Sequence, residues 1–256
     1  MNILILSVMI CLGFCLGSFI HCAISRFLPD QTMIQYFKEI IFSRSKCPHC
    51  HKKLNILSLI PIFSWLKQRG RCKYCLAIIP IDYLITELIV GIYCLGITYC
   101  YNLTVWSIIL IFIGLYYALL AIIDFKYLLL PNYLTYPLLL TGLLFAYFDV
   151  GLITFYDALF GAIYGYTLLS IPAAVYYLIK KRAGLGGGDI KLLAALGTWL
   201  PVTELVNLLL YASIVGITYF IIYKAIVRPI EKNILVPFGS CLLICAYLRL
   251  LILSFN

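Results

Sequence analysis

Long apolar stretches, broken only by short polar turns, constrain this chain more than any other feature of its sequence. Of its 256 residues, 64% are hydrophobic and only 11% are charged, whereas an ordinary soluble domain carries about 25% charged residues. A helix that crosses a membrane needs about 20 mainly apolar residues. The sequence therefore predicts an all-α polytopic membrane protein with about eight transmembrane helices.

The expected helices follow the apolar stretches. We place them at residues 3–25, 83–100, 105–123, 133–149, 157–179, 189–201, 203–225 and 236–254. The stretch from 189 stops near Pro201 after about 12 residues, too few for a full crossing. It predicts either a half-span buried among other helices or a tilted helix where the bilayer is thin. Close helix packing is expected at four glycines: Gly161, Gly165, Gly197 and Gly216.

Basic residues gather on one side of the expected membrane topology. Residues 26–80 hold ten Lys and Arg against two acidic residues. Smaller basic groups follow later helices, at Lys180, Lys181 and Arg182 and at Lys224, Arg228 and Lys232. Basic loops stay in the cytoplasm, so we expect an inner-membrane protein whose first helix, residues 1–25, is retained with its N-terminus outside. Because topology already explains this charge, nucleic-acid binding is disfavoured.

The loop at residues 26–82 is long enough for a separate folded unit, and it holds two cysteine pairs. Cys47-Pro-His-Cys50 and Cys72-Lys-Tyr-Cys75 are separated by 21 residues. Paired C-x-x-C turns suit tetrahedral zinc, since each presents two thiolates; a redox pair or incidental thiols are the alternatives. We expect structural zinc on these four cysteines in a small zinc-ribbon-like cytoplasmic domain, followed by a transmembrane domain at residues 83–256.

Two aspartates stand at the edges of apolar stretches, where a carboxylate is costly and usually functional. Asp124 ends one stretch, and Asp189 follows the glycine cluster Gly184-Leu185-Gly186-Gly187-Gly188. Two carboxylates that meet can share one proton, so that one activates water while the other protonates the substrate. The HExxH motif of zinc proteases is absent. The pair therefore predicts the active site of a membrane-embedded aspartic protease.

Each aspartate also has a simpler interpretation, in which it merely caps the end of a helix. Asp is a favoured N-cap, so Asp189 can merely begin a helix, although three adjacent glycines, which allow close backbone approach to a substrate, favour catalysis. The helix dipole should favour the charged form of Asp189 and the protonated form of Asp124, which would make Asp189 the water-activating base. Lys191 is expected to face substrate or to reach toward lipid headgroups, and Glu87 is a third acidic candidate.

Two other function classes remain open. A proton- or cation-coupled transporter would use Asp124 and Asp189 near the bilayer midplane, and their expected positions at the ends of helices disfavour it. A non-catalytic scaffold of a secretion assembly would use the cysteine loop for docking. Such a scaffold would tolerate Asn at both aspartate positions.

Six ordered motifs together resemble those of the type IV prepilin peptidases, which are membrane aspartic proteases of the GxGD type. They are Gly17-Ser18-Phe19-Ile20-His21 with Arg26 and Pro29, the tetracysteine loop, Tyr83 to Gly91, Asp124 with Leu129-Leu130-Pro131-Asn132-Tyr133-Leu134-Thr135, Gly186-Gly187-Gly188-Asp189-Ile190-Lys191-Leu192, and Val236-Pro237-Phe238-Gly239. The resemblance covers nearly the whole chain.

The resemblance implies an enzyme that cleaves the basic leader from type IV prepilins and pseudopilins at the cytoplasmic membrane face, in type IV pilus or type II secretion systems. It also implies methylation of the new N-terminal residue with S-adenosylmethionine, with prepilins and membrane lipid as partners and no nucleic acid. Asp124 and Asp189 carry over as the catalytic pair. The residues expected to support the substrate are Gly186, Gly188, Lys191, Glu87 and Gly91.

Three positions depart from the family's pattern. His21 stands where the family usually has Asn, Asn132 stands where it has Asp, and Ser240 stands where it has Pro. We expect none of these departures to touch the two catalytic positions.

Overall fold

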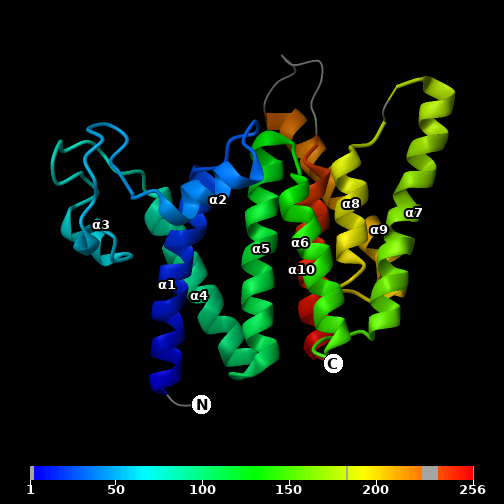
Figure 1. Cartoon of the computed structure of the whole chain (residues 1–256), viewed down its shortest axis with the longest axis horizontal. Helices are drawn as coiled ribbons and strands as arrows, with labels where there is room; N and C mark the ends of the chain where they lie inside the picture. Colours follow the sequence, from blue (N-terminus) through cyan, green and yellow to red (C-terminus); the bar gives the residue numbers. More distant parts are fainter. Residues whose placement is uncertain (1–2, 183, 227–235, 256) are drawn as a thin grey trace. The chain divides into compact units, whose positions relative to one another are not determined.

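Helices make up the regular structure of the chain, as a computed structural model shows (Figure 1). It describes residues 3–182, 184–226 and 236–255, so Arg228 and Lys232, expected in a basic loop, lie outside the described residues. The chain divides into two compact units, residues 1–115 and 116–256. One helix, α5 (Val105–Tyr127), passes from the first unit into the second. The three-part division expected at residues 25 and 82 stays a prediction.

Two helices, α1 (Ile3–Ser25) and α4 (Asp82–Tyr101), form the frame of the first unit and pack along each other. A Cβ atom at Gly13 would lie 2.8 Å from the Cα of Gly91, and one at Gly17 would lie 2.8 Å from the Cα of Glu87. No side chain fits between the backbones at these positions. Small residues on α1 therefore allow the two helices to touch.

The loop between these helices forms α2 (Met33–Phe42), a short 3-10 turn η1 (Ile56–Ser58) and the brief helix α3 (Phe63–Lys67). Thr32 begins α2 with a capping box, in which its hydroxyl accepts the N–H of Gln35 while the Gln35 side chain accepts the N–H of Thr32. Tyr36 is buried, and its hydroxyl donates to the carbonyl oxygen of Ala23 at 3.2 Å. This contact fixes α2 on the end of α1.

The second unit encloses one short helix, α8 (Gly187–Leu196). It packs against α6 (Asn132–Tyr147), α7 (Phe155–Lys180) and α10 (Phe238–Phe255), while α9 (Val202–Ile226) packs against α7 and α10. A Cβ at Gly161 would lie 2.0 Å from the carbonyl oxygen of Gly197, and one at Gly165 would lie 2.6 Å from that of Leu193. The close packing predicted at these three glycines is confirmed. At Gly216 the nearest atom would be 3.6 Å away, an ordinary contact that does not require glycine.

The predicted class of all-α membrane protein is confirmed, whereas eight spans are not. Six helices of the described residues are long and apolar enough to cross a membrane: α1, α4, α5, α7, α9 and α10. The helices α6 and α8 have 16 and 10 residues, fewer than the roughly 20 that a crossing needs. The residues from Leu192 to Leu196 are all buried, so α8 is the short helix buried among others that the sequence predicted.

Candidate active site and metal centre

Asp124 lies in the last turn of α5, and its side chain is only 5% exposed. Its Oδ2 accepts a hydrogen bond from the backbone N–H of Ser240, in the first turn of α10, at 2.6 Å. The hydroxyl oxygen of Ser240 lies 2.9 Å from the same Oδ2 and 2.8 Å from the carbonyl oxygen of Ala121. The Ser240 hydroxyl has one hydrogen and can donate to only one of these oxygens at a time. The backbone N–H of Ser240, by contrast, always donates to Asp124.

Asp189 is the third residue of α8 and not its cap. Gly186 is the N-cap, without a side-chain capping bond, and the N–H of Asp189 donates to the carbonyl oxygen of Gly186 at 3.2 Å. The interpretation of Asp189 as a simple helix cap is therefore wrong. Its side chain is half-buried and close enough to Asp124 for the two carboxylates to interact electrostatically. The second unit thus brings the two predicted aspartates together.

Glycines near this pair allow close packing, because a side chain at two of them would crowd neighbouring atoms. A Cβ at Gly239 would lie 3.0 Å from Oδ2 of Asp124 and 2.8 Å from Cδ1 of Leu130. A Cβ at Gly188 would lie 3.1 Å from Cβ of Leu130, whereas one at Gly187 would meet nothing within 4 Å. Leu130 therefore lies against the first turns of both α8 and α10, and open space adjoins Gly187.

Lys191 is directed toward α6. Its Nζ donates to Oδ1 of Asn132 at 2.9 Å and lies 5.9 Å from the ring centre of Tyr136. Asn132, one of the three departures from the family's pattern, is therefore the partner of Lys191. This bond joins the first residue of α6 to the fifth residue of α8.

Ser240 is the residue of the site that sequence reasoning missed. The expectation that Ser240 touches neither catalytic position is wrong, because its backbone N–H donates to Asp124. A proline at this position has no N–H to donate. The loss of proline next to Gly239 was the available signal, but its partner lies 116 residues away in the chain. Only tertiary packing reveals that contact.

The four loop cysteines gather in the first unit. The Sγ atoms of Cys47, Cys50, Cys72 and Cys75 all lie within 4.8 Å of one another, and those of Cys47 and Cys75 are 3.8 Å apart. Four thiolates bound about 2.3 Å from one zinc ion would stand about 3.8 Å apart at the corners of a tetrahedron. The donor set and its spacing therefore fit zinc.

Two similar turns present these thiols. Each turn is closed by a single antiparallel bridge: Lys46 with Lys53, and Arg71 with Ile78. The backbone N–H groups of Cys50 and His49 lower the pKa of the Cys47 thiol. The N–H of Tyr74 and that of the next residue lower the pKa of the Cys72 thiol to about 6. Burial and the three neighbouring thiols raise the pKa of the Cys75 thiol to about 11. Because the thiolate is the form that binds metal, the backbone N–H groups of the two turns favour metal binding at Cys47 and Cys72.

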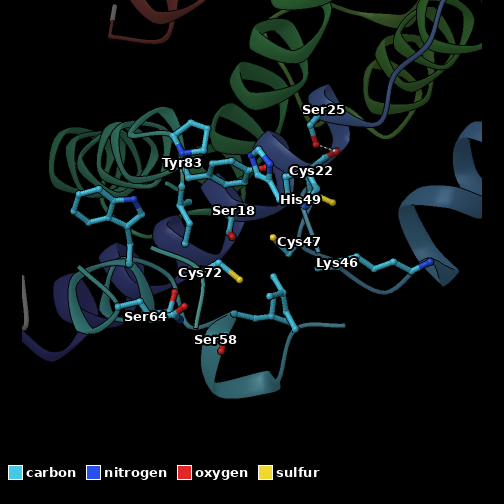
Figure 2. A pocket seen from close by; sticks show the side chains of 18 of the residues that line it. Ser18, Cys22, Ser25, Lys46, Cys47, His49, Ser58, Ser64, Cys72 and Tyr83 are labelled. Carbon is cyan, nitrogen blue, oxygen red and sulfur yellow. Dashed lines mark hydrogen bonds between the residues drawn. The ribbon is translucent and has the colours of Figure 1, made fainter. Parts of the chain in front are cut away.

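A cavity of about 470 Å³ adjoins the cysteine cluster within the first unit (Figure 2). Cys47 and Cys72 line it from the loop, Ser18 lines it from α1, and Tyr83 lines it from α4. Glu87 also lines it, and the side chain of this residue is 6% exposed. The cavity therefore brings together α1, α4 and the loop that connects them.

Two residues predicted to support the substrate, Glu87 and Gly91, belong to this first unit, whereas both aspartates belong to the second. A Cβ at Gly91 would lie 2.2 Å from the ring of Phe14, so Gly91 serves the packing of α1 on α4. Glu87, by contrast, faces the cavity. The support of the substrate predicted for Glu87 stays a prediction.

Two family models match the chain over most of its length. The bacterial peptidase A24 N-terminal domain matches residues 11–101, and the type IV leader peptidase family matches residues 109–221. No solved structure matches the chain.

Individual proteins are similar along most of the chain. The type 4 prepilin-like proteins leader peptide-processing enzyme of Escherichia coli is 30% identical over 90% of this chain and 87% of its own length. The prepilin leader peptidase/N-methyltransferase of Aeromonas hydrophila is 35% identical over 83% of this chain and 72% of its own. That of Vibrio cholerae is 30% identical over 87% of this chain and 90% of its own.

Proposed function

This chain belongs to the type IV leader peptidase family, and we propose that it is a membrane aspartic endopeptidase that removes the basic leader from type IV prepilins and pseudopilins. The names of its relatives support a second activity, N-methylation of the new N-terminal residue, with S-adenosylmethionine as the methyl donor. The observation that carries the cleavage activity is the nearness of Asp124, at the end of α5, to the start of α8, which holds Asp189: Leu130 lies against Gly188 and also against Gly239, which adjoins Oδ2 of Asp124.

Hydrogen bonding supports different roles for the two aspartates. The N–H of Ser240 stabilises the carboxylate form of Asp124, while the side chain of Asp189 accepts no hydrogen bond from the described residues. We assign Asp124 as the base that takes a proton from the attacking water and Asp189 as the acid that protonates the scissile amide. This reverses the expectation from the helix dipole, because a short bond to a carboxylate outweighs a screened terminal dipole.

The surroundings of the pair suit a substrate that is itself a membrane helix. Both aspartates lie on helices of an apolar, multi-pass protein, and open space adjoins Gly187. The basic loop at residues 26–80 supports a cytoplasmic orientation in the inner membrane, with lipid as a partner. Zinc on the four cysteines would join the two loop turns and contribute folding free energy rather than chemistry.

The cleavage proposal is tested with purified enzyme and a prepilin-like peptide, read by mass spectrometry. We expect Asp124→Asn and Asp189→Asn each to lower the cleavage rate by at least about a thousandfold, since each removes a group that acts in the transition state. The control is Asp149→Asn, because Asp149 is exposed and has φ 53°, a conformation that Asn adopts readily. Normal cleavage in both active-site variants would refute the protease and support a scaffold.

A further inference from the structure

One ion pair joins two membrane-spanning helices of the second unit. Arg249 of α10 donates to Oε2 of Glu204, in the first turn of α9, from Nε at 2.8 Å and from Nη2 at 2.5 Å. Arg249 is nine residues past Ser240, or about 14 Å further along α10. The pair therefore lies inside a hydrocarbon layer about 30 Å thick, where ionisable side chains are costly and mark a function.

Arg249 is held on α9 by a second contact. Its guanidinium lies 6.0 Å from the ring centre of Tyr211, which is seven residues past Glu204 and so on the same face of α9. The side chains of Arg249 and Glu204 are only 22% and 15% exposed. A guanidinium directs its N–H groups in a fixed plane, so a shift of α10 along α9 by one turn would break the pair.

The start of α9 is in turn fixed to the end of α8. The N–H of Glu204 donates to the carbonyl oxygen of Pro201 at 2.9 Å, and residues 192–200 are all buried. Within them, Nε1 of Trp199 donates to the carbonyl oxygen of Leu138 in α6 at 3.0 Å. Glu204 therefore belongs to a closely packed connection that begins with α8, the helix of Asp189.

The helix α10 thus has a polar contact toward each end. In its first turn, the N–H of Ser240 donates to Asp124, and further along, Arg249 pairs with Glu204. We propose that Arg249 and Glu204 are positioning residues of the protease. Their pair sets where α10 stands along α9, and thereby keeps the N–H of Ser240 on Asp124. This inference rests on the cleavage activity proposed above and adds two residues that act through Ser240.

An ion pair suits this task better than an apolar contact. Apolar side chains of similar volume would stabilise the contact between α9 and α10 equally well, but they would let one helix slide along the other. Two opposite charges in a medium of low dielectric constant attract strongly only at one register, and separating them leaves each charge unpaired in the membrane. The pair therefore specifies one position of α10.

Hydrogen–deuterium exchange tests this positioning without relying on enzyme activity. The variant is the full-length double substitution Glu204→Gln with Arg249→Met, which removes both charges and leaves neither unpaired, so that it folds. The N–H of Ser240 has no acceptor within its own helix, and its protection comes from Asp124. We expect the peptide that holds Ser240 to exchange at least about tenfold faster in the double variant, while peptides of α7 keep the wild-type rate.

Kinetics of peptide cleavage give a second, independent measurement. In the double variant we expect kcat to fall about threefold to tenfold, no more than loss of the Ser240 N–H itself would cause, while KM stays nearly constant. Lys224→Met is the matched control, because it removes an exposed cation from the last turn of α9 and leaves kcat unchanged.

A double-mutant cycle shows whether the pair acts through Ser240. Ser240→Pro has no N–H to donate, so nothing remains at this position for the pair to hold against Asp124. In the Ser240→Pro background we therefore expect removal of the two charges to lower kcat by less than about twofold more. Losses that multiply instead would show that the pair acts by another route, and would overturn the inference.

The outcomes separate failure of this inference from failure of the proposed function. The inference requires both faster exchange at Ser240 and a lower kcat in the double variant, and either change without the other overturns it. A lower Tm with unchanged kcat assigns the pair to stability alone. In both cases the protease proposal stands, because the wild type still cleaves. A wild-type enzyme that cleaves no prepilin-like peptide refutes the proposed function, and the exchange measurement still decides whether the pair positions Ser240.

Discussion

At the scale of single residues, Ser240 determines how Asp124 is held. Its N–H belongs to the first turn of α10 and has no acceptor within the helix, so Asp124 satisfies a donor that would otherwise be unpaired. A hydrogen bond to a charged acceptor contributes about 1.5–3 kcal/mol. Proline at this position removes the donor without breaking the helix, because the first turn tolerates proline.

We expect Ser240→Pro to lower kcat for peptide cleavage about threefold to tenfold while KM stays nearly constant, since the lost bond acts on the charge of Asp124 and not on substrate binding. This effect is smaller than the factor of more than about ten that about 1.5–3 kcal/mol would give, because the family's pattern carries proline at this position. Ser240→Ala keeps the N–H and should lose less, and Ser240→Thr should match the wild type. Steady-state kinetics on a prepilin-like peptide measure all three. If Ser240→Pro and the wild type have equal kcat, the assignment of Asp124 as the base is wrong and Asp189 is the base.

At the scale of elements, the position of α8 depends on backbone contact with α7. A Cβ at Gly161 would lie 2.0 Å from the carbonyl oxygen of Gly197, so Gly161→Val forces the two helices apart. Such overpacking costs about 1–3 kcal/mol. It also moves Asp189, at the start of α8, away from Asp124. We therefore expect a lower Tm in detergent together with a loss of cleavage of at least about tenfold.

The matched control for this variant is Gly216→Ala in the same unit. A Cβ at Gly216 would have its nearest neighbour at 3.6 Å, and alanine is favoured over glycine inside a helix by about 1 kcal/mol. Its Tm should equal or exceed that of the wild type, with cleavage unchanged. A Gly161→Val variant that kept both its Tm and its cleavage rate would show that the contact between α7 and α8 does not position the active site.

Helices were predictable where an apolar run or a proline in the sequence determines their bounds. The first helix was expected at residues 3–25 and is Ile3–Ser25, and Pro201 correctly predicted that α8 is short. The helices that enclose α8 were not predictable, because the second half of α8, from Leu192 to Leu196, is apolar on all sides and its pattern singles out no neighbour. Close helix packing was predicted at Gly161, Gly165 and Gly197, and the structure confirms it, but the sequence did not say which helix each glycine would meet.

The candidate site was predictable to the same limited extent. Asp124 and Asp189 were found because a carboxylate beside an apolar run is costly. The bond from Ser240 to Asp124 and that from Ile62 to Glu87 both use a backbone N–H, a group that nearly every residue carries. The positive φ of Ile62 has no sequence signature either, since β-branched residues avoid that region. These contacts depend on tertiary packing and become visible only in the structure.

At the scale of the whole molecule, the two units carry different chemical groups. The first unit holds the cysteine cluster and the cavity beside it, and the second holds the aspartates and α8. We expect methylation to depend on an ordered loop and cleavage to depend on the packing of the second unit. Removing zinc tests that separation, because its ligands all lie in the loop.

Structural zinc contributes an apparent free energy of about 10–16 kcal/mol to the folding of small cysteine-rich units. Its loss should therefore unfold the loop. We expect Cys75→Ser to lose zinc and methylation while cleavage stays within about tenfold of the wild type. Cys15→Ser, an exposed cysteine of α1 outside the cluster, should keep one zinc per chain and both activities. Elemental analysis and peptide mass spectrometry measure these outcomes. Full zinc content with normal methylation in Cys75→Ser would contradict the metal site, and equal loss of both activities would show that the loop also presents the leader to the aspartates.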